Sequence, residues 1–264
     1  CTQGSKGDDP AERRTLESGA SVVFAEDPGA PNVTLTFCFQ GGRALESRAR
    51  RNLVDLAAAV LSDRLRSLAS VNAGAAAASD GPVAVEARED ELRLQVEFPA
   101  GEFATSLPAL CECLGAHEVP VEALAEARAR IDPTLRAQAT VAAQQAEAVL
   151  GKLASGRGQA VEEEARSAEE FEAEDLEGFL ARQCVQARLV VGVSGPLKLA
   201  AAEKLLATSL AAMPRGDPPE ARSAPAFLQP PRRQVWILDD STGNEVQIAL
   251  AAPGVRRDDP DAAA

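Results

Sequence analysis

The stretch from Asn32 to Leu68 constrains the fold most, because it encodes a strand, a sharp exit and a helix in direct succession. Apolar and polar side chains alternate from Val33 to Phe39, as in a strand with one buried face. Gly41 and Gly42 follow, and glycine allows backbone angles that a side chain would forbid. Apolar residues then recur at helical spacing: Leu53, Leu56, Val60, Leu61, Leu65 and Leu68. The pattern predicts a helix that packs back on the sheet.

The same pattern returns near the end of the sequence at one constant offset, which indicates an internal repeat. The aligned pairs are Val22 and Val235, Asp27 and Asp240, Val33 and Val246, Gly41 and Gly254, Arg43 and Arg256, and Glu46 and Asp259. We therefore expect a duplicated domain whose second copy has barely begun at Ala264. The expected organisation is a flexible tether (1–14), a complete domain (15–213), a proline-rich linker (214–233) and the start of a second domain (234–264).

The remaining elements predict the fold class. Residues 91–98 alternate without a break and pair with a short strand at 83–85, and residues 22–24 form a hairpin-like entry to the strand at 33–39. Helices are expected at 103–114, from Pro120 to 131, at 135–150, after a capping box at 167–170, and from 199 to 213, with Ser194 as cap before the last one. This grouped order indicates an α+β domain with a mixed, mostly antiparallel sheet and helices packed on one face.

Charge restricts the partners. The chain has 27 basic and 40 acidic residues and a formal net charge of −13, which disfavours nucleic acid or an anionic membrane surface as a partner held by charge. No segment approaches the roughly 20 consecutive apolar residues that a membrane-spanning helix needs. A membrane link is therefore expected only through a lipid anchor.

Cys1 is the candidate for that anchor. It precedes a polar, glycine-containing run, 2–10, and this arrangement resembles a mature bacterial lipoprotein, which implies lipidation of Cys1 and a periplasmic, membrane-anchored location. The alternative is a chain boundary that happens to fall on a cysteine. The other cysteines, Cys38, Cys111, Cys113 and Cys184, are interpreted as small buried hydrophobic residues, and no disulfide is predicted.

Several local phrases accompany this order of elements: ESG at 17–19, the glycine pair at 41–42, RLVVG at 188–192 and PGVRRDDP at 253–260. Together with the repeat, they resemble the insulinase, pitrilysin and mitochondrial processing peptidase family of zinc peptidases. The resemblance covers nearly all of the chain from Thr15 onward. It implies one half of a clamshell that encloses peptide substrates.

The resemblance also locates the family's zinc motif, H-x-x-E-H, on the helix after the glycine pair. The matching positions are Asp55, Ala58 and Ala59, and the chain contains a single histidine. The third ligand, a glutamate on a later helix, has no secure counterpart in 121–134. Residues 62–65 (SDRL) resemble the non-catalytic half-domains of the family, although the substrate-gripping tyrosine of some such domains is missing from a chain without tyrosine.

Two other groups of residues resemble functional motifs but have simpler interpretations. Cys111 and Cys113 with His117 and Glu118 carry metal-binding atoms, but residues two apart on a helix point in different directions, which favours a helix end with a surface histidine. The run 192–195 (GVSG) precedes Pro196, so it lacks the second glycine of a hydrolase nucleophile elbow. The acidic run 162–164 is interpreted as a solvated surface.

These observations predict a catalytically silent, insulinase-like domain that contributes to peptide binding or to assembly of a peptidase chamber. Its expected partners are a zinc-bearing subunit of the same family and a peptide substrate. No cofactor is expected on this chain, with zinc supplied only by a partner or by a missing region. The alternative is a fragment of an active zinc metalloendopeptidase whose metal motif lies outside this chain.

Overall fold

The computed structural model describes residues 11–46, 52–71, 83–88, 90–140 and 170–219. The chain divides into two compact units, Cys1–Ile131 with Ala165–Pro219, and Asp132–Glu164 with Glu220–Ala264. All the described strands belong to the first unit. The described residues of the second unit are 132–140, which form the end of one helix. The predicted linker and second repeat, from residue 220 onward, lie outside the described residues, as do Cys1 and the acidic run at 162–164.

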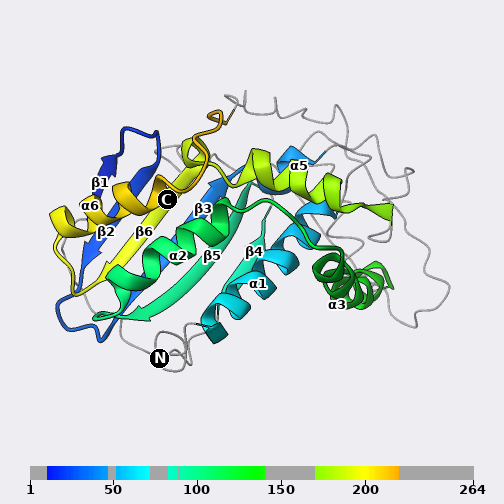
Figure 1. Cartoon of the computed structure of the whole chain (residues 1–264), viewed down its shortest axis with the longest axis horizontal. Coiled ribbons are helices and arrows are strands. Elements are labelled where there is room, and N and C mark those ends of the chain that lie inside the picture. Colours follow the sequence, from blue (N-terminus) through cyan, green and yellow to red (C-terminus); the bar gives the residue numbers. More distant parts are fainter. Residues whose placement is uncertain (1–10, 47–51, 72–82, 89, 141–169, 220–264) are drawn as a thin grey trace, which may run out of the picture. The chain divides into compact units, whose positions relative to one another are not determined.

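Six strands form one mixed sheet in the order β1-β2-β6-β3-β5-β4 (Figure 1). The strands are β1 (Glu12–Thr15), β2 (Ser21–Glu26), β3 (Asn32–Gln40), β4 (Ala84–Ala87), β5 (Glu91–Pro99) and β6 (Leu189–Gly195). Only the β2 and β6 pair is parallel among these neighbours, and the other four pairs are antiparallel. The α+β class, the mostly antiparallel sheet and the pairing of β4 with β5 are as the sequence predicts.

The predicted hairpin between residues 22–24 and 33–39 is wrong. β6 lies between β2 and β3, so that Val193 is opposite both Phe24 and Leu35. The turn after β2 passes over the end of β6, where the Asp27 amide donates to the Gly195 carbonyl at 2.9 Å. The hairpin partner of β2 is instead β1, which begins at Glu12, inside the segment 1–14 that the sequence assigned to a tether, and ends at Thr15 in the predicted domain.

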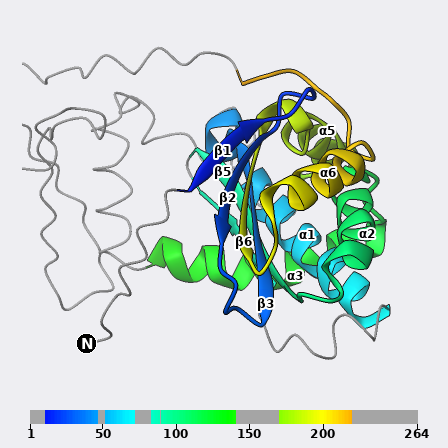
Figure 2. The same cartoon turned by 90° about the vertical axis from the view of Figure 1, so that its left-hand side faces the viewer.

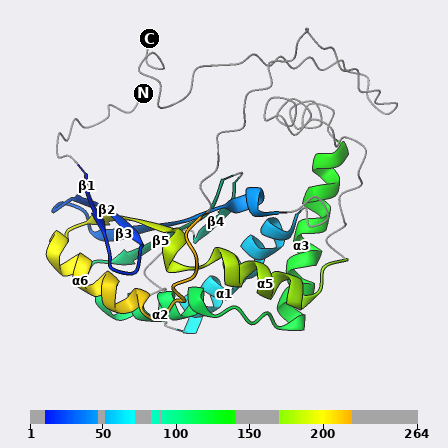
Figure 3. The same cartoon turned by 90° about the horizontal axis from the view of Figure 1, so that it is seen from above.

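Helices cover one face of the sheet (Figures 2 and 3). They are α1 (Leu53–Val71), α2 (Phe103–Gly115), α5 (Ala173–Gln183) and α6 (Leu199–Leu210). The strand side chains that face them are buried: Val22, Phe24, Val33, Leu35, Phe37, Phe39, Leu92, Leu94, Leu189, Val191 and Val193. Removing side chains of this size from water stabilises the fold by about 1.5–3 kcal/mol each. The alternate residues, such as Thr34, Thr36 and Cys38, are half-buried on the opposite face.

Helix α3 (Val121–Thr140) is continuous, whereas the sequence predicts a break at 132–133. A proline inside a helix removes one amide donor, and the carbonyl that Pro133 leaves without its usual donor belongs to Ala129. Ala129 is solvent-exposed, so water can satisfy that carbonyl. Helix α2 contains Pro108 in the same way, with exposed Ala104 one turn earlier. A helix can therefore continue through a proline where the carbonyl one turn earlier is exposed to water.

The predicted capping box at 167–170 lies outside the described residues apart from Glu170, and α5, which begins at Ala173, has a capping box formed by Glu172 and Asp175. Ser194 does not cap α6, because it belongs to β6 and the residue before the helix is Lys198, which makes no side-chain cap. Within the described residues, no helix combines the length and apolar character that crossing a membrane requires.

Candidate metal position

The glycine pair brings the chain from β3 to the start of α1 by a route that only glycine can take. Gly42 has a φ of 52°, and a Cβ there would overlap the Arg88 carbonyl and lie 2.6 Å from the Glu91 amide nitrogen. Gly41 has a φ of 136°, and its amide donates to the Asp90 carbonyl at 2.6 Å. The chain therefore passes directly against the turn between β4 and β5, and this close approach requires residues without side chains.

Arg43 connects three elements at this place. It lies in the short 3-10 helix η1 (Gly42–Leu45) and donates from Nη2 to Asp55 Oδ1 at 2.6 Å. Its Nη1 donates to the Ala87 carbonyl at 2.8 Å, and its backbone amide donates to the Arg88 carbonyl at 3.0 Å. The guanidinium thus holds the start of α1 to the end of β4, and it is the cation beside Asp55.

Glu46 occupies the amino-terminal end of α1. Its Oε1 accepts a hydrogen bond from the Val54 amide at 2.6 Å, which satisfies one of the open donors of the first helical turn. Burial raises the pKa of the Glu46 carboxyl to about 7, and nearby Asp55 raises it further, while the amides of Val54 and Asn52 and the charge of Arg43 oppose the shift. Burial dominates, because the carboxylate loses more hydration than these donors return.

Ala58 and Ala59 lie one turn further along α1 and are both 8% exposed. Their methyl groups carry no atom that can coordinate a metal, and the one carboxylate at the matched positions, Asp55, is paired with Arg43. These three residues do not fit a zinc ion, which takes four nitrogen, sulfur or oxygen ligands in structural sites and three in catalytic ones. Among the residues described, no group of three His, Cys, Asp or Glu side chains is arranged to hold a metal.

The SDRL residues at 62–65, next along α1, contact neighbouring elements of the fold. Ser62 is buried, and Asp63 pairs with Arg66 of the same helix and with Arg130 of α3. Arg64 donates to the carbonyls of Ala116 and Glu118 in the connection between α2 and α3. Asp63 and Arg64 therefore fasten α1 to neighbouring elements.

The four described cysteines and His117 are buried or half-buried, and burial shifts their pKa values. Cys38, Cys111, Cys113 and Cys184 are free thiols, and burial raises the pKa to about 11 for Cys38 and about 12 for Cys111 and Cys184. Such thiols stay protonated and are poor metal ligands at neutral pH. His117 is half-buried, and its Nε2 is shielded from solvent and lacks a hydrogen-bond partner among the described residues. Burial lowers the pKa of His117, and the charge of Arg64 lowers it further, although a bond with the Cys184 backbone opposes the shift.

The zinc motif does not identify Arg43 and Glu46, because the motif covers only the positions of Asp55, Ala58 and Ala59. The signal that identifies them is the internal repeat, in which Arg43 aligns with Arg256 and Glu46 with Asp259. A charged pair that recurs beside a repeated glycine exit indicates a role at that exit. Residues 256 and 259 lie outside the described part of the chain.

The sequence matches no protein-family model and no curated protein at a significant level. Solved structures match with low identity. One is a peptidase M16 inactive domain from Pseudomonas fluorescens, with a TM-score of 0.69, 20% identity, and coverage of 82% of this chain and 54% of that chain. Another is the first half of the periplasmic protease PqqL from Escherichia coli, with a TM-score of 0.67, 15% identity, and coverage of 83% and 49%.

Pitrilysin is a third match, with a TM-score of 0.63, 13% identity, and coverage of 82% of this chain and 24% of that chain. At these identities the likeness is one of fold. The chain spans about half of the first two structures and about a quarter of the third.

Proposed function

Because the chain has the fold of the insulinase and pitrilysin peptidases, we propose that it is a non-catalytic domain of a peptidase assembly. The observation that carries this proposal is the chemistry at the matched motif positions. Asp55 is engaged by Arg43, and Ala58 and Ala59 offer only buried methyl groups. The Arg43 guanidinium bridges α1 and β4, so a structural contact occupies the place where the family motif would carry metal ligands.

The proposed role is to bind and orient peptide for a zinc-bearing partner of the same fold. A wall that does not react can still accelerate a reaction, because it restricts how the substrate presents its scissile bond to a remote catalytic group. The half-exposed face of the sheet carries Thr34, Thr36 and Gln95, bare backbone at Gly192, and the charged side chains of Glu91, Arg93 and Glu97. Such a surface suits contact with the backbone of a peptide.

A second candidate function is that of one domain in an active zinc endopeptidase. The internal repeat and the greater length of the matched structures favour it. In this case the protein region that follows the Gly254 exit would carry two histidines and a glutamate at the spacing H-x-x-E-H. Reading the encoded sequence beyond Ala264 decides between the two candidates: a complete motif favours the enzyme, and a degenerate one favours the silent assembly subunit.

The test of the first candidate is the purified chain of 264 residues. After equilibration with zinc and removal of the excess, elemental analysis is expected to find far less than one zinc per chain, and unfolded peptides are expected to remain intact. Stoichiometric zinc together with proteolysis that a chelator abolishes would reject the proposal.

We further propose that Cys1 is lipidated and that the protein works at the bacterial periplasmic membrane with its partner. Detergent extraction and affinity purification of the chain with Cys1 intact should recover a zinc-bearing family member. The Cys1→Ser variant should leave the membrane fraction while keeping that partner. Recovery of no family member would refute the partner proposal, and a membrane-bound Cys1→Ser protein would refute the anchor.

A further inference from the structure

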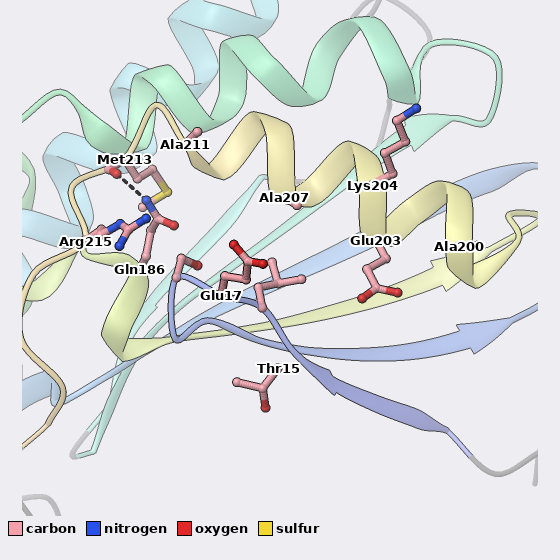
Figure 4. Close-up of a pocket in the computed structure, with 12 residues that line it drawn as sticks. Thr15, Glu17, Gln186, Ala200, Glu203, Lys204, Ala207, Ala211, Met213 and Arg215 are labelled. Atoms are coloured by element: carbon pink, nitrogen blue, oxygen red, sulfur yellow. Dashed lines mark hydrogen bonds between the residues drawn. The ribbon is translucent and has the colours of Figure 1, made fainter.

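A groove of about 670 Å³ lies between the turn that joins β1 to β2 and the exposed side of α6 (Figure 4). It is at the β1 edge of the sheet, whereas Asp55 and Arg43 are beside β4 at the other edge. Its volume is within the range of about 300–1,000 Å³ that is typical of small-ligand sites. The groove is therefore a site separate from the degenerate metal position.

One wall of the groove suits the close approach of a backbone. Ala200 and Ala207 lie along one side of α6, Ala211 directly follows the last residue of this helix, and all three line the groove. The helix rises about 1.5 Å per residue, so this wall is about 16 Å long. An extended peptide advances about 3.3 Å per residue, and the wall therefore matches about five residues of extended chain.

Four charged residues line the groove, Glu17, Glu203, Lys204 and Arg215, and of these Lys204 directs its amine away from it (Figure 4). Arg215 lies at the end near Ala211, beside Gln186, and Glu203 lies toward Ala200, with the Glu17 carboxylate between them (Figure 4). In the part of the chain that the structure describes, none of Arg215, Glu203 and Glu17 has an ion-pair or side-chain hydrogen-bond partner. A ligand with a carboxylate at one end and a cationic group toward the other complements this arrangement.

The segment that carries Arg215 is held in place before any ligand binds. Gln186 is 4% exposed, and its Nε2 donates to the Met213 carbonyl at 2.6 Å. The backbone amides of Gln186 and Ala187 donate to the carbonyls of Pro214 and Arg215, each at 2.9 Å. A site fixed in this way loses less conformational entropy on binding than a mobile loop would.

We propose that this groove binds a short extended peptide of about five residues, with its terminal carboxylate on Arg215 and a basic side chain between Glu17 and Glu203. The peptide runs along the alanine wall of α6 with its carboxyl end toward Ala211. The choice of a peptide as the ligand class rests on the proposed function. The opposite charges at the two ends define the polarity of the peptide.

The test uses the acetylated pentapeptide KAAAL with a free carboxylate, titrated into the 264-residue chain by isothermal calorimetry. Two matched peptides separate the charges: one carries a terminal amide in place of the carboxylate, and the other carries norleucine in place of lysine. The parent peptide is expected to bind saturably at one site, and each altered peptide about tenfold or more weakly, since hydrogen bonds to charged groups contribute about 1.5–3 kcal/mol.

Matched variants assign the contacts. Arg215→Gln should weaken the parent peptide by about tenfold or more but leave the amide peptide unchanged, and Glu203→Gln should weaken the parent but not the norleucine peptide. Lys204→Gln is the control, because it removes a positive charge from a lining residue of the same helix whose amine points away from the groove (Figure 4). It should change the affinity by less than about twofold.

Three results would overturn the proposal: no saturable binding of the parent peptide, equal affinity for the acid and the amide, or equal losses in Arg215→Gln and Lys204→Gln. These results are distinct from a failure of the proposed function. Zinc-dependent proteolysis by the purified chain would reject the non-catalytic role, whereas absence of groove binding from an inactive, zinc-free chain would reject only the peptide site at α6.

Discussion

Arg43 Nη2 lies 2.6 Å from Asp55 Oδ1, and the same guanidinium donates to the Ala87 carbonyl at 2.8 Å. Asp55 is the only residue with ligand atoms among the three positions matched to the zinc motif, and this arrangement gives it a protein partner. The pair is partly exposed, with 40% of the Arg43 side chain and 22% of the Asp55 side chain accessible. Its strength is therefore moderated by solvent.

A double-mutant cycle with Arg43→Met and Asp55→Asn measures this pair. The coupling free energy from urea unfolding should be about 0.5–1 kcal/mol in favour of the pair, as for partly screened ion pairs. Arg43→Met alone should cost more than Asp55→Asn, because it also leaves the Ala87 carbonyl without its donor. The control cycle is Arg14 with Glu12, which are about half exposed on β1. Equal coupling in the two cycles would show that Arg43 has no special role.

A histidine introduced at one of the motif positions should destabilise the fold. Ala59 is 8% exposed on the side of α1 that packs in the core, and an imidazole there exceeds the space that a methyl group fills. Ala59→His should reduce the free energy of unfolding by about 1–3 kcal/mol, which is typical of overpacked cores. Ala125→His, at an exposed position of α3, is the control and should be nearly neutral. A variant at Ala59 as stable as the parent would mean that the site has kept room for a ligand.

Glu46 should make stability fall as the pH rises. Its pKa is raised to about 7 in the folded chain, above the ordinary value of 4.5, so the folded state holds a proton that the unfolded state has released. The favourable contribution is therefore complete below about pH 4.5 and is lost between there and pH 7, by about 3 kcal/mol.

Glu46→Gln keeps an oxygen acceptor for the Val54 amide and removes the titration. Urea unfolding of the parent and the variant from pH 4 to pH 8 should show a difference that grows with pH in favour of the variant. A constant difference across that range would contradict the raised pKa.

The contribution of His117 to stability should fall as the pH decreases, which is opposite to that of Glu46. Its pKa is lowered by burial, so the unfolded chain binds a proton more readily than the folded chain below the ordinary value of 6.5. Stability from this residue is therefore retained above about pH 6.5 and is lost as the pH falls through that value. His117→Leu should lose less stability than the parent on acidification, as measured by urea unfolding. Because Glu46 titrates in an overlapping window, the comparison is best repeated in the Glu46→Gln background.

Gly42→Ala should disrupt the exit from β3. The residue has a φ of 52°, and a Cβ would overlap the Arg88 carbonyl. Combined backbone strain and overlap should cost about 2–4 kcal/mol or prevent folding. Gly101→Ala is the matched control, because a Cβ there meets nothing within 4 Å. Thermal unfolding of the two variants should separate them clearly, and similar melting temperatures would show that the turn can relax.

Local patterns predicted the elements of this fold better than their connections. The alternation from Val33 to Phe39 and from Glu91 to Phe98 identified two central strands, because each pattern reflects a single buried face. Strand order depends on pairing between distant residues, and no local pattern specifies that β6 separates β2 from β3. The assumed hairpin followed from proximity in sequence, which is informative for β4 and β5 and misleading for β2 and β3.

The candidate site shows the same limit. Asp55, Ala58 and Ala59 were located from a motif on one helix. Arg43 and Glu46 act through contacts with α1 and β4 that depend on the folded turn. The burial of the Glu46 carboxyl likewise depends on three-dimensional packing. From the sequence alone, a buried Glu46 cannot be distinguished from a solvated one.

The position of β6 between β2 and β3 has a consequence during synthesis on the ribosome. β2 and β3 emerge early, but the strand that joins them is complete only at Gly195. Until then, each of these early strands lacks the neighbour that will cover one of its edges, and an uncovered edge can pair with another nascent chain. Closure of the sheet must therefore wait for nearly the whole domain, and molecular chaperones that shield exposed strand edges should increase the yield of folded protein.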